Sequence, residues 1–154
     1  MVQYDPKKVP PSTPEQHKEL GLAFCKKLFG NPDVTKKLLD SKVIARFVYW
    51  DDELWGPGVT VELTVDCSHG EIVVMTEPND LPADLVIEES RATAHIYWMG
   101  KLNFMTAVTR GLIKVKGSIR VAMKLVPILK PGFAYYRETL EELGYDELLA
   151  YPPD

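Results

Sequence analysis

The chain has 154 residues, of which 45% are hydrophobic and 26% are charged, and its formal net charge is −4. This length and hydrophobic content suit one domain with its own core, and the negative charge disfavours nucleic acid as a partner. The two cysteines, Cys25 and Cys67, lack metal-site spacing, which argues against a metal cage or a disulfide framework and fits a reducing compartment.

Residues 1–14 contain four prolines and are expected to form an extended, mobile arm. This arm has no apolar stretch of the kind found in secretory signals, and no apolar run approaches the ~18 residues of a membrane span. The last residues do not form a peroxisomal address. We therefore expect a cytoplasmic protein.

The first regular element is predicted to be a helix that begins after Thr13. Thr13, Pro14 and Gln16 supply an N-cap, a proline in the first turn and a capping-box partner. The apolar stripe of this helix comprises Leu20, Ala23, Phe24 and Leu28. Residues 30–32, Gly-Asn-Pro, end it, and a short second helix is expected over 33–39.

Four strands are predicted next, because β-branched, aromatic and alternating apolar residues dominate this part of the chain. They cover residues 43–50, 59–65, 71–76 and 84–88, and the second and third form a hairpin. The acidic run 51–53 is interpreted as a solvated loop, with a weak cation site as the alternative.

The rest of the chain is predicted to be mostly helical, and each of the next three helices begins at a capping Ser or Asn. The order is helix 90–99, helix 103–111, strand 112–116 and helix 118–129. Pro127 is expected to break or kink the last of these, and a terminal amphipathic helix over 133–143 ends at Gly144. Hairpin strands followed by helices, one late strand and more helices indicate an α+β fold with a mainly antiparallel sheet.

The helix over 118–129 is apolar on most of its circumference, so it must be buried on several sides or face something apolar besides its own protein. One face carries Ile119, Ala122, Met123 and Val126, and a second face carries Val121, Leu125 and Ile128. Core packing explains both faces. Alternatively, one face lines a cavity for an apolar ligand, and the flexible methionine thioether fits that use.

The same region is similar to the sterol carrier protein 2 (SCP2) family. The matching pieces are Gly100–Asn103, Met105–Ala107, Gly111, the Leu-x-Lys-x-Lys-Gly strand over 112–117 and Ala122–Leu125, with Ala83–Ile87 upstream. The resemblance implies a five-stranded, mainly antiparallel sheet with helices covering one face and an apolar tunnel between the layers. It also implies an SCP2-like lipid-binding domain over 15–130, with 131–154 as a helical extension of the same domain.

The function implied by the resemblance is non-catalytic binding and intracellular transfer of a fatty acid, fatty acyl-CoA, isoprenoid or sterol-like lipid. The expected lining residues are Trp98, Met99, Leu102, Phe104, Met105, Val108, Ile119, Ala122, Met123 and Val126. Relatives often have Asn-Pro where this chain has Asn103-Phe104, and a glutamine where it has Val126. Valine cannot hydrogen-bond a head group, so a sterol ligand does not follow from the resemblance.

Two further groups of residues have alternative interpretations. Lys114, Lys116, Arg120 and Lys124 are either solvent-facing or form, with Lys101 and Arg110, a patch for an anionic membrane surface or a coenzyme A phosphate. The other group supports a different function, that of an accessory or oligomerisation module of a larger lipid- or aromatic-metabolising system. In that function a homodimer surface, or a lid over the tunnel, is formed by Phe133, Tyr135, Tyr136 and Tyr151.

An enzyme that has reused the cavity is the third hypothesis, but the sequence gives it no positive support. No catalytic motif, cofactor site or metal site is predicted. His17, His69 and His95 lack mutual metal-ligand spacing and are expected to be exposed or structural. Cys25 is expected to be a buried, inert thiol.

Overall fold

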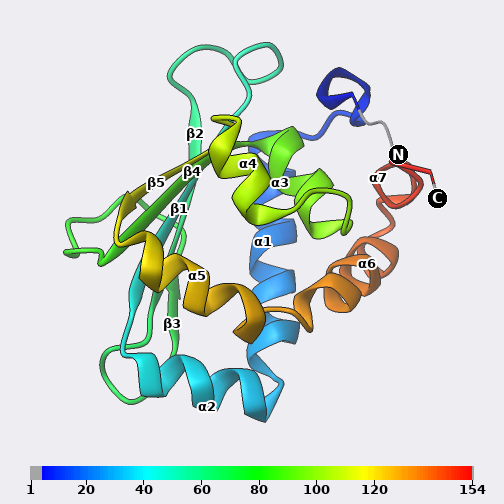
Figure 1. Cartoon of the computed structure of the whole chain (residues 1–154). Helices are drawn as coiled ribbons and strands as arrows, with labels where there is room; N and C mark the ends of the chain where they lie inside the picture. The colour runs from blue at the N-terminus through cyan, green and yellow to red at the C-terminus, as the bar shows by residue number, and fades with distance from the viewer. Residues whose placement is uncertain (1–4, 154) are drawn as a thin grey trace.

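A five-stranded sheet with helices to one side forms the protein, as the computed structural model shows for residues 5–153 (Figure 1). The strands are β1 (Ile44–Trp50), β2 (Thr60–Asp66), β3 (Val73–Met75), β4 (Leu85–Ser90) and β5 (Ile113–Gly117), arranged in the order β3-β2-β1-β4-β5. β1 and β4 are parallel, and the other three pairs are antiparallel. The predicted α+β fold with a mainly antiparallel sheet is confirmed.

The helices follow the predicted order, and most of their ends lie within two residues of the predicted ones. They are η1 (Pro6–Lys8), α1 (Pro14–Phe29), α2 (Pro32–Ser41), α3 (Arg91–Trp98), α4 (Phe104–Thr109), α5 (Ile119–Ile128), α6 (Gly132–Leu143) and α7 (Asp146–Leu149). The predicted capping residues of α1, α3, α4 and α5 each accept a backbone hydrogen bond. Pro127 lies in the last turn of α5, and the helix ends one residue later at Ile128, as expected beside a residue that donates no backbone hydrogen bond.

Two glycines let helices approach their neighbours closely. A Cβ atom at Gly21 of α1 would lie 2.6 Å from Leu63 Cδ1 of β2. A Cβ atom at Gly132 of α6 would lie 2.7 Å from Trp98 Cζ3 of α3. Because a side chain at either position would overlap these groups unless they moved, the glycines allow α1 to cover the sheet closely and α6 to pack closely on α3.

The predicted mobile arm is held against the domain in its described part, while residues 1–4 lie outside the described residues. Val9 is buried. Arg91 Nη1 donates a hydrogen bond to the Pro10 carbonyl at 2.9 Å, and Trp55 Nε1 donates one to the Ser12 carbonyl at 2.8 Å. From residue 5 onward, the arm is therefore a bound segment rather than a free one.

The acidic run 51–53 is not simply a solvated loop. Asp51 Oδ2 lies 3.1 Å from Nε of the buried Arg91, and the Asp51 side chain is largely covered. The first acid of the run thus has a structural ion pair. Within the described residues, no group of three His, Cys, Asp or Glu side chains is placed to hold a metal ion.

His95 joins α3 to the C-terminal segment. Its Nε2 lies 2.7 Å from the Tyr151 carbonyl oxygen, which only accepts, so Nε2 carries the proton and donates. Its Nδ1, 2.7 Å from the Tyr136 hydroxyl, then accepts a hydrogen bond from that hydroxyl. Burial is the main cause that lowers the pKa of His95 to about 4, so the ring is neutral over the physiological range.

We expect this histidine to make the fold sensitive to acid. Its pKa is about 4 in the folded chain and about 6.5 when unfolded. As the pH falls from 6.5 toward 4, the unfolded chain therefore takes up a proton that the folded chain does not, and the free energy of unfolding decreases. The loss approaches about 1.4 kcal/mol per pH unit. Urea unfolding of the wild type and His95→Gln at pH 7 and pH 5 measures it. The variant should lose less stability between the two pH values, and an equal loss would contradict the assignment.

None of the helices between residues 5 and 153 combines the length and apolar composition that a bilayer crossing requires.

Candidate functional site

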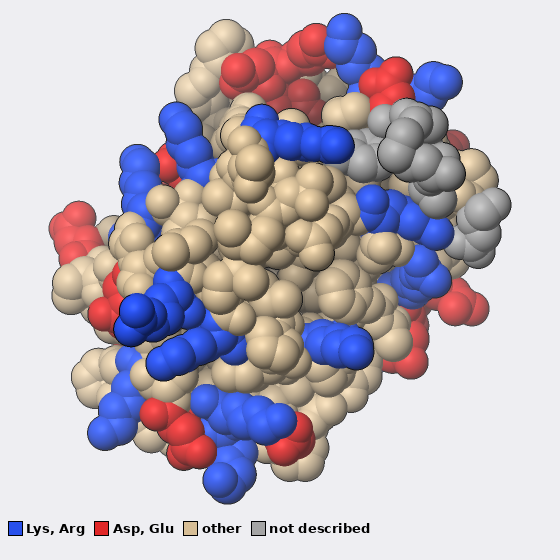
Figure 2. Space-filling model, viewed as in Figure 1, with Lys and Arg blue, Asp and Glu red and all other residues tan. Residues whose placement is uncertain are grey.

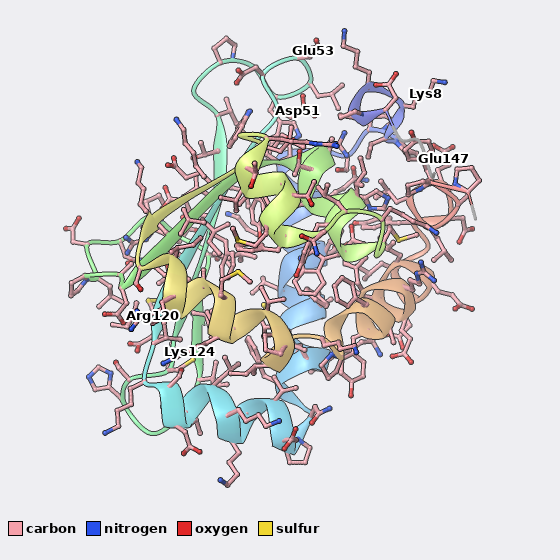
Figure 3. All side chains as sticks on the ribbon, in the orientation of Figure 1. Lys8, Asp51, Glu53, Arg120, Lys124 and Glu147 are labelled. Atoms are coloured by element: carbon pink, nitrogen blue, oxygen red, sulfur yellow. The ribbon has the colours of Figure 1, made fainter. Side chains whose placement is uncertain are left out.

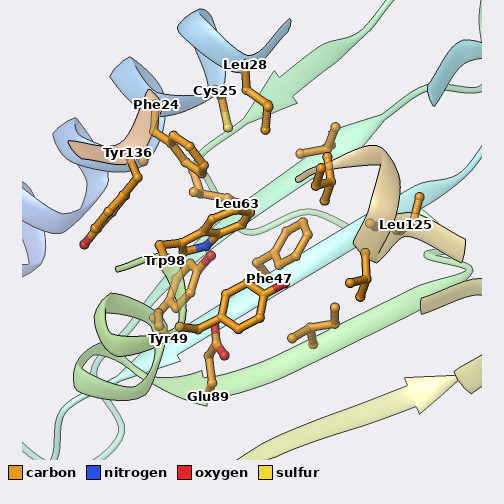
Figure 4. A pocket seen from close by; sticks show the side chains of 18 of the residues that line it. Phe24, Cys25, Leu28, Phe47, Tyr49, Leu63, Glu89, Trp98, Leu125 and Tyr136 are labelled. Carbon is orange, nitrogen blue, oxygen red and sulfur yellow. The ribbon is translucent and has the colours of Figure 1, made fainter. Parts of the chain in front are cut away.

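A cavity of about 120 Å³ lies between the sheet and the helices (Figure 4). Strand alternation builds one wall, because every second residue of β1, β2 and β4 points toward the helices. Helices α1, α3 and α5 supply most of the rest. The inner wall of the sheet comprises Ala45, Phe47, Tyr49, Leu63, Val65, Ile87 and Glu89.

The cavity extends along α1. Both His17 and Phe29 line it, and these positions on α1 are separated by about 18 Å of helix at 1.5 Å per residue. The empty space is similar to the cavity of about 150 Å³ that encloses one benzene molecule, so the walls must move apart to admit a longer chain. The direction of the cavity along α1 suits an extended alkyl chain.

Four of the ten predicted lining residues lie on the cavity wall, namely Trp98, Phe104, Ala122 and Val126. The other six do not. Met99 and Leu102 are buried in the adjoining core, and Val108 is half-buried. Exposed positions are occupied by Met105, Ile119 and Met123, with exposed fractions of 39%, 42% and 39%.

The structure corrects the orientation of α5. The sequence grouped Ala122 and Val126 with Ile119 and Met123, but the stripe that faces the cavity is Ala122, Leu125, Val126 and Leu129. These positions follow the spacing of three, four and seven that defines one helical face. Several faces of this helix are apolar, so periodicity alone did not distinguish the inner stripe.

One end of the cavity carries polar side chains that the sequence reasoning missed. Glu89 is only 4% exposed, and alternation along β4 places it on the same face as Leu85 and Ile87. Its neighbour across the parallel β1–β4 pair is Tyr49, and Figure 4 shows the two side chains next to each other. The period-two pattern of residues 85–89 was the signal that could have identified this glutamate.

Burial controls the protonation of the side chains at this end of the cavity. It raises the pKa of Glu89 to about 8, so the carboxyl group is mostly uncharged at neutral pH. The ring of His17 lies edge-on to Tyr49, with ring centroids 4.6 Å apart. Burial, followed by the nearby Arg91 charge, lowers the pKa of His17 to about 3. The polar end therefore presents uncharged groups that can form hydrogen bonds.

Cys25 also lines the cavity and confirms the expectation of a buried thiol. Burial raises its pKa to about 12. A thiol with such a high pKa stays protonated, and the protonated form is a poor nucleophile. Cys25 thus contributes apolar surface to the wall.

The outer face of α4 and α5 is apolar at its centre and basic around it. Figure 2 shows a broad uncharged area in the middle of this view with Lys and Arg around it, and Figure 3 shows Arg120 and Lys124 along α5. Met105, Ile119 and Met123 are the exposed large apolar residues of α4 and α5. Ile119 and Met123 lie one turn apart on α5, and we call these two residues the outer apolar patch.

The predicted basic cluster is divided between two surfaces. Lys114 and Lys116 alternate with inward residues of β5 and are exposed, as the solvent-face interpretation predicts, and Lys116 Nζ lies 3.0 Å from Glu88 Oε1. Arg120 and Lys124 are exposed on α5, close in sequence to Ile119 and Met123. Arg120 and Lys124 therefore lie about 100° further round α5 than Ile119 and Met123, on the adjoining face of the helix.

The C-terminal aromatic residues are engaged inside the domain. Phe133 packs against Trp98 with ring centroids 5.3 Å apart, and Tyr136 is buried and bound to His95. The Tyr135 hydroxyl accepts a hydrogen bond from Asn31 Nδ2 at 3.2 Å, and the Tyr151 hydroxyl accepts one from the Asp5 amide at 2.9 Å. Tyr136 is buried and Phe133, Tyr135 and Tyr151 are half-buried, so all four contribute to the packing of the domain.

Comparison with known proteins gives a consistent result. A sequence profile of the SCP-2 sterol transfer family matches residues 51–130. The fold is similar to a conserved hypothetical protein of Thermus thermophilus, with 22% identity, a TM-score of 0.59 and coverage of 79% of this chain and 86% of that one. For a crystal structure of sterol carrier protein 2, the identity is 23%, the TM-score 0.60 and the coverage 78% and 95%.

A third structure with this fold is UbiJ-SCP2, described as a ubiquinone synthesis protein, with 14% identity, a TM-score of 0.52 and coverage of 80% of this chain and 95% of that one. The search of curated proteins found no match. At these identities, the solved structures establish likeness of fold.

Proposed function

The chain belongs to the SCP-2 sterol transfer family, and we propose that it binds a lipid of medium chain length in the cavity between sheet and helices. A fatty acid, fatty acyl-CoA, isoprenoid or sterol-like molecule is the proposed class of ligand, carried without chemical change. The observation that carries the proposal is the largely apolar cavity of about 120 Å³, with its hydrogen-bonding groups gathered at one end. That distribution matches an amphiphile.

Hydrophobic burial alone supplies useful affinity. Each buried methylene contributes about 0.8 kcal/mol, so a chain of about ten methylenes gains about 8 kcal/mol. This corresponds to a dissociation constant near the micromolar range before entropic costs are subtracted. Transfer of a lipid needs no catalytic group, and the apolar walls tolerate variation in chain length.

The direct experiment is native mass spectrometry of the gently purified protein, combined with titration of a fluorescent fatty acid. We expect a co-purified amphiphile or a bound probe at a one-to-one ratio, with displacement of the probe by unlabelled lipid. A protein that carries no lipid and binds no probe would contradict the proposal.

Delivery of the lipid is the finer part of the proposal, and we assign it to the outer apolar patch. Ile119 and Met123 are exposed while Ala122 and Val126 on the same helix line the cavity, so the patch borders the cavity-facing stripe of α5. Arg120 and Lys124 flank it, and each cation near an anionic membrane contributes about 1 kcal/mol. An anionic membrane surface is the proposed docking partner, and the phosphates of an acyl-CoA are the alternative source of negative charge.

Met123→Glu is expected to weaken binding to anionic vesicles by about tenfold or more, because it adds a negative charge to the patch and removes apolar area. Affinity for a soluble fluorescent fatty acid should stay within about twofold, since Met123 does not line the cavity. Sedimentation with vesicles of phosphatidylcholine, with and without phosphatidylglycerol, measures the first effect. Val73→Glu, an exposed apolar residue of the edge strand β3 changed in the same way, is the matched control.

Equal loss of vesicle binding in both variants would contradict a specific patch and indicate a general charge effect. If Met123→Glu also lost affinity for the fatty acid, Met123 would contact the bound ligand, as the sequence predicted. If coenzyme A competes with vesicles for the wild type but not for Arg120→Ala, the basic residues bind acyl-CoA phosphates instead.

The alternative function is an accessory module of a larger lipid- or aromatic-metabolising system. The fold similarity to UbiJ-SCP2, a ubiquinone synthesis protein, supports this alternative function. Light scattering after size-exclusion chromatography separates the two functions, because a carrier that acts alone elutes as a monomer that retains lipid.

A further inference from the structure

The cavity contains an acid that the fold itself does not use. Glu89 is 4% exposed and borders the cavity. Among residues 5–153, its carboxyl group has neither a hydrogen-bond partner nor a counter-ion. No fully buried side-chain nitrogen or oxygen atom among residues 5–153 lacks a hydrogen-bond partner, so the Glu89 oxygens are reached from the cavity, where a ligand or water can bind them.

The groups around Glu89 come from four elements. Tyr49 of β1 is its register neighbour, and the Glu89 charge also acts on Tyr97 of α3 and Tyr136 of α6, whose pKa values are raised mainly by burial. Across the cavity, α1 contributes the neutral His17. All of these groups are uncharged near neutral pH, so none of them serves as a counter-ion for an ionised carboxylate.

Arg91, the basic residue close to Glu89 in sequence, is already engaged elsewhere. Arg91 follows Glu89 by two residues at the start of α3, but its Nε pairs with Asp51 at 3.1 Å. Its Nη1 donates to the Pro10 carbonyl at 2.9 Å and to Ser12 Oγ at 3.4 Å. The Tyr136 hydroxyl is likewise bound to His95. The Glu89 carboxyl and the Tyr49 hydroxyl, for which no hydrogen bond is found in the described part of the chain, remain available to a ligand.

We propose that Glu89, with Tyr49 beside it, anchors the head group of the ligand and selects amphiphiles that end in an uncharged hydroxyl. This inference rests on the proposed lipid-binding function and names the chemistry of the lipid. The alkyl chain extends from this anchor along α1 toward Leu28, Phe29 and Leu38, where the cavity is lined by apolar side chains.

A hydroxyl is the best complement to this end of the cavity. A protonated carboxyl group has one O–H donor and a carbonyl acceptor, and an alcohol offers the same pair in return. A cationic head group would require an ionised Glu89 in a dry site, and burial of such a pair brings a large desolvation cost. A carboxylate head group would bring a second acid beside the first, which becomes repulsive once either partner ionises.

The protonation of Glu89 gives the selection a pH dependence. Burial raises its pKa to about 8, so the carboxyl donor is present at pH 7 and is lost as the pH rises above 8. Preference for the alcohol should therefore be greatest at neutral and mildly acidic pH and should decline at pH 9.

The test compares 1-decanol with 1-chlorodecane, supplied from cyclodextrin and measured by displacement of a fluorescent fatty acid. The two ligands share one alkyl chain, and only the alcohol has an O–H group. In the wild type at pH 7 we expect decanol to bind about tenfold more tightly. Glu89→Gln retains a donor and an acceptor and should keep this ratio within about threefold. Glu89→Leu should reduce the ratio to about one while still binding chlorodecane.

Glu88→Leu is the matched control, because Glu88 is the preceding residue on the same strand and alternation places it on the opposite face of the sheet. It should leave the ratio unchanged. An unchanged ratio in Glu89→Leu, or a preference of the wild type for decylamine over decanol at pH 7, would overturn the inference alone. A wild type that binds neither ligand nor the probe would overturn the proposed function and this inference together.

Discussion

Ala122→Phe is expected to lower affinity for lipids with ten to twelve carbons by more than about a hundredfold. Ala122 is buried on α5 and borders the cavity, so a benzyl group at this position enters the space of the ligand. A cavity of about 150 Å³ holds one benzene molecule, and the cavity here measures about 120 Å³. Displacement of about four methylenes costs about 3 kcal/mol of binding free energy, which is a factor above one hundred.

Met123→Phe provides the matched control, because it introduces the same side chain at the next position on the same helix. Met123 is 39% exposed and lies off the cavity wall, so its variant should bind lipid within about twofold of the wild type. Fluorescent fatty acid titration measures both affinities, and circular dichroism verifies that both variants fold. If Ala122→Phe binds lipid as well as Met123→Phe does, the ligand occupies another part of the molecule.

The second large effect concerns stability. Glu89→Leu is expected to raise the free energy of unfolding by about 3 kcal/mol at pH 7, since it removes an unpartnered buried acid and fills part of the cavity. The pKa of Glu89 is about 8 in the folded chain and about 4.3 when unfolded. Between these values, the folded chain retains a proton that the unfolded chain releases. Stability from this residue therefore falls as the pH rises from about 4.3 to 8, by up to about 1.4 kcal/mol per unit.

Urea unfolding of the wild type, Glu89→Leu and Glu88→Leu at pH 5 and pH 8 measures this effect. The difference in stability between Glu89→Leu and the wild type should be larger at pH 8 than at pH 5. Glu88→Leu should follow the pH dependence of the wild type. Parallel pH profiles for all three proteins would show that Glu89 ionises as freely in the folded chain as in the unfolded one.

The loss of folding stability caused by Glu89 and the selectivity for a head group have the same physical origin. A carboxyl group without a protein partner destabilises the empty fold, and a ligand hydroxyl supplies the missing hydrogen bonds. Natural proteins commonly retain destabilising residues at sites that bind or react. The two measurements on Glu89→Leu are therefore expected to agree, with a more stable protein that no longer distinguishes decanol from chlorodecane.

Local signals predicted the secondary structure well, because nearby residues mark where most elements begin and end. Thr13 with Gln16 forms the capping box that the sequence predicted, and Ser118 accepts a hydrogen bond from the Val121 amide. The elements that were missed, η1 and α7, are only three and four residues long. Elements this short contain too few residues to show a hydrophobic period.

The site was predicted less completely, since it depends on pairings between distant parts of the chain. Glu89 faces the cavity because β4 pairs in parallel with β1, which lies some forty residues earlier. His17 was expected to be exposed or structural, and it continues the buried stripe of Leu20 and Phe24 at helical spacing. In both cases, the pattern of one element fixed which residues share a face, and only the tertiary packing determined which face is covered.

The most direct test of the proposed binding site is a crystal structure of the protein with 10-bromodecan-1-ol, whose bromine is located by its anomalous scattering. The account predicts one chain inside the cavity, with bromine near Leu28 and Leu38 and the hydroxyl oxygen within hydrogen-bond distance of the Glu89 carboxyl group. An alcohol found only on the outer surface, with the space between α1 and the sheet left unoccupied by ligand, would contradict it.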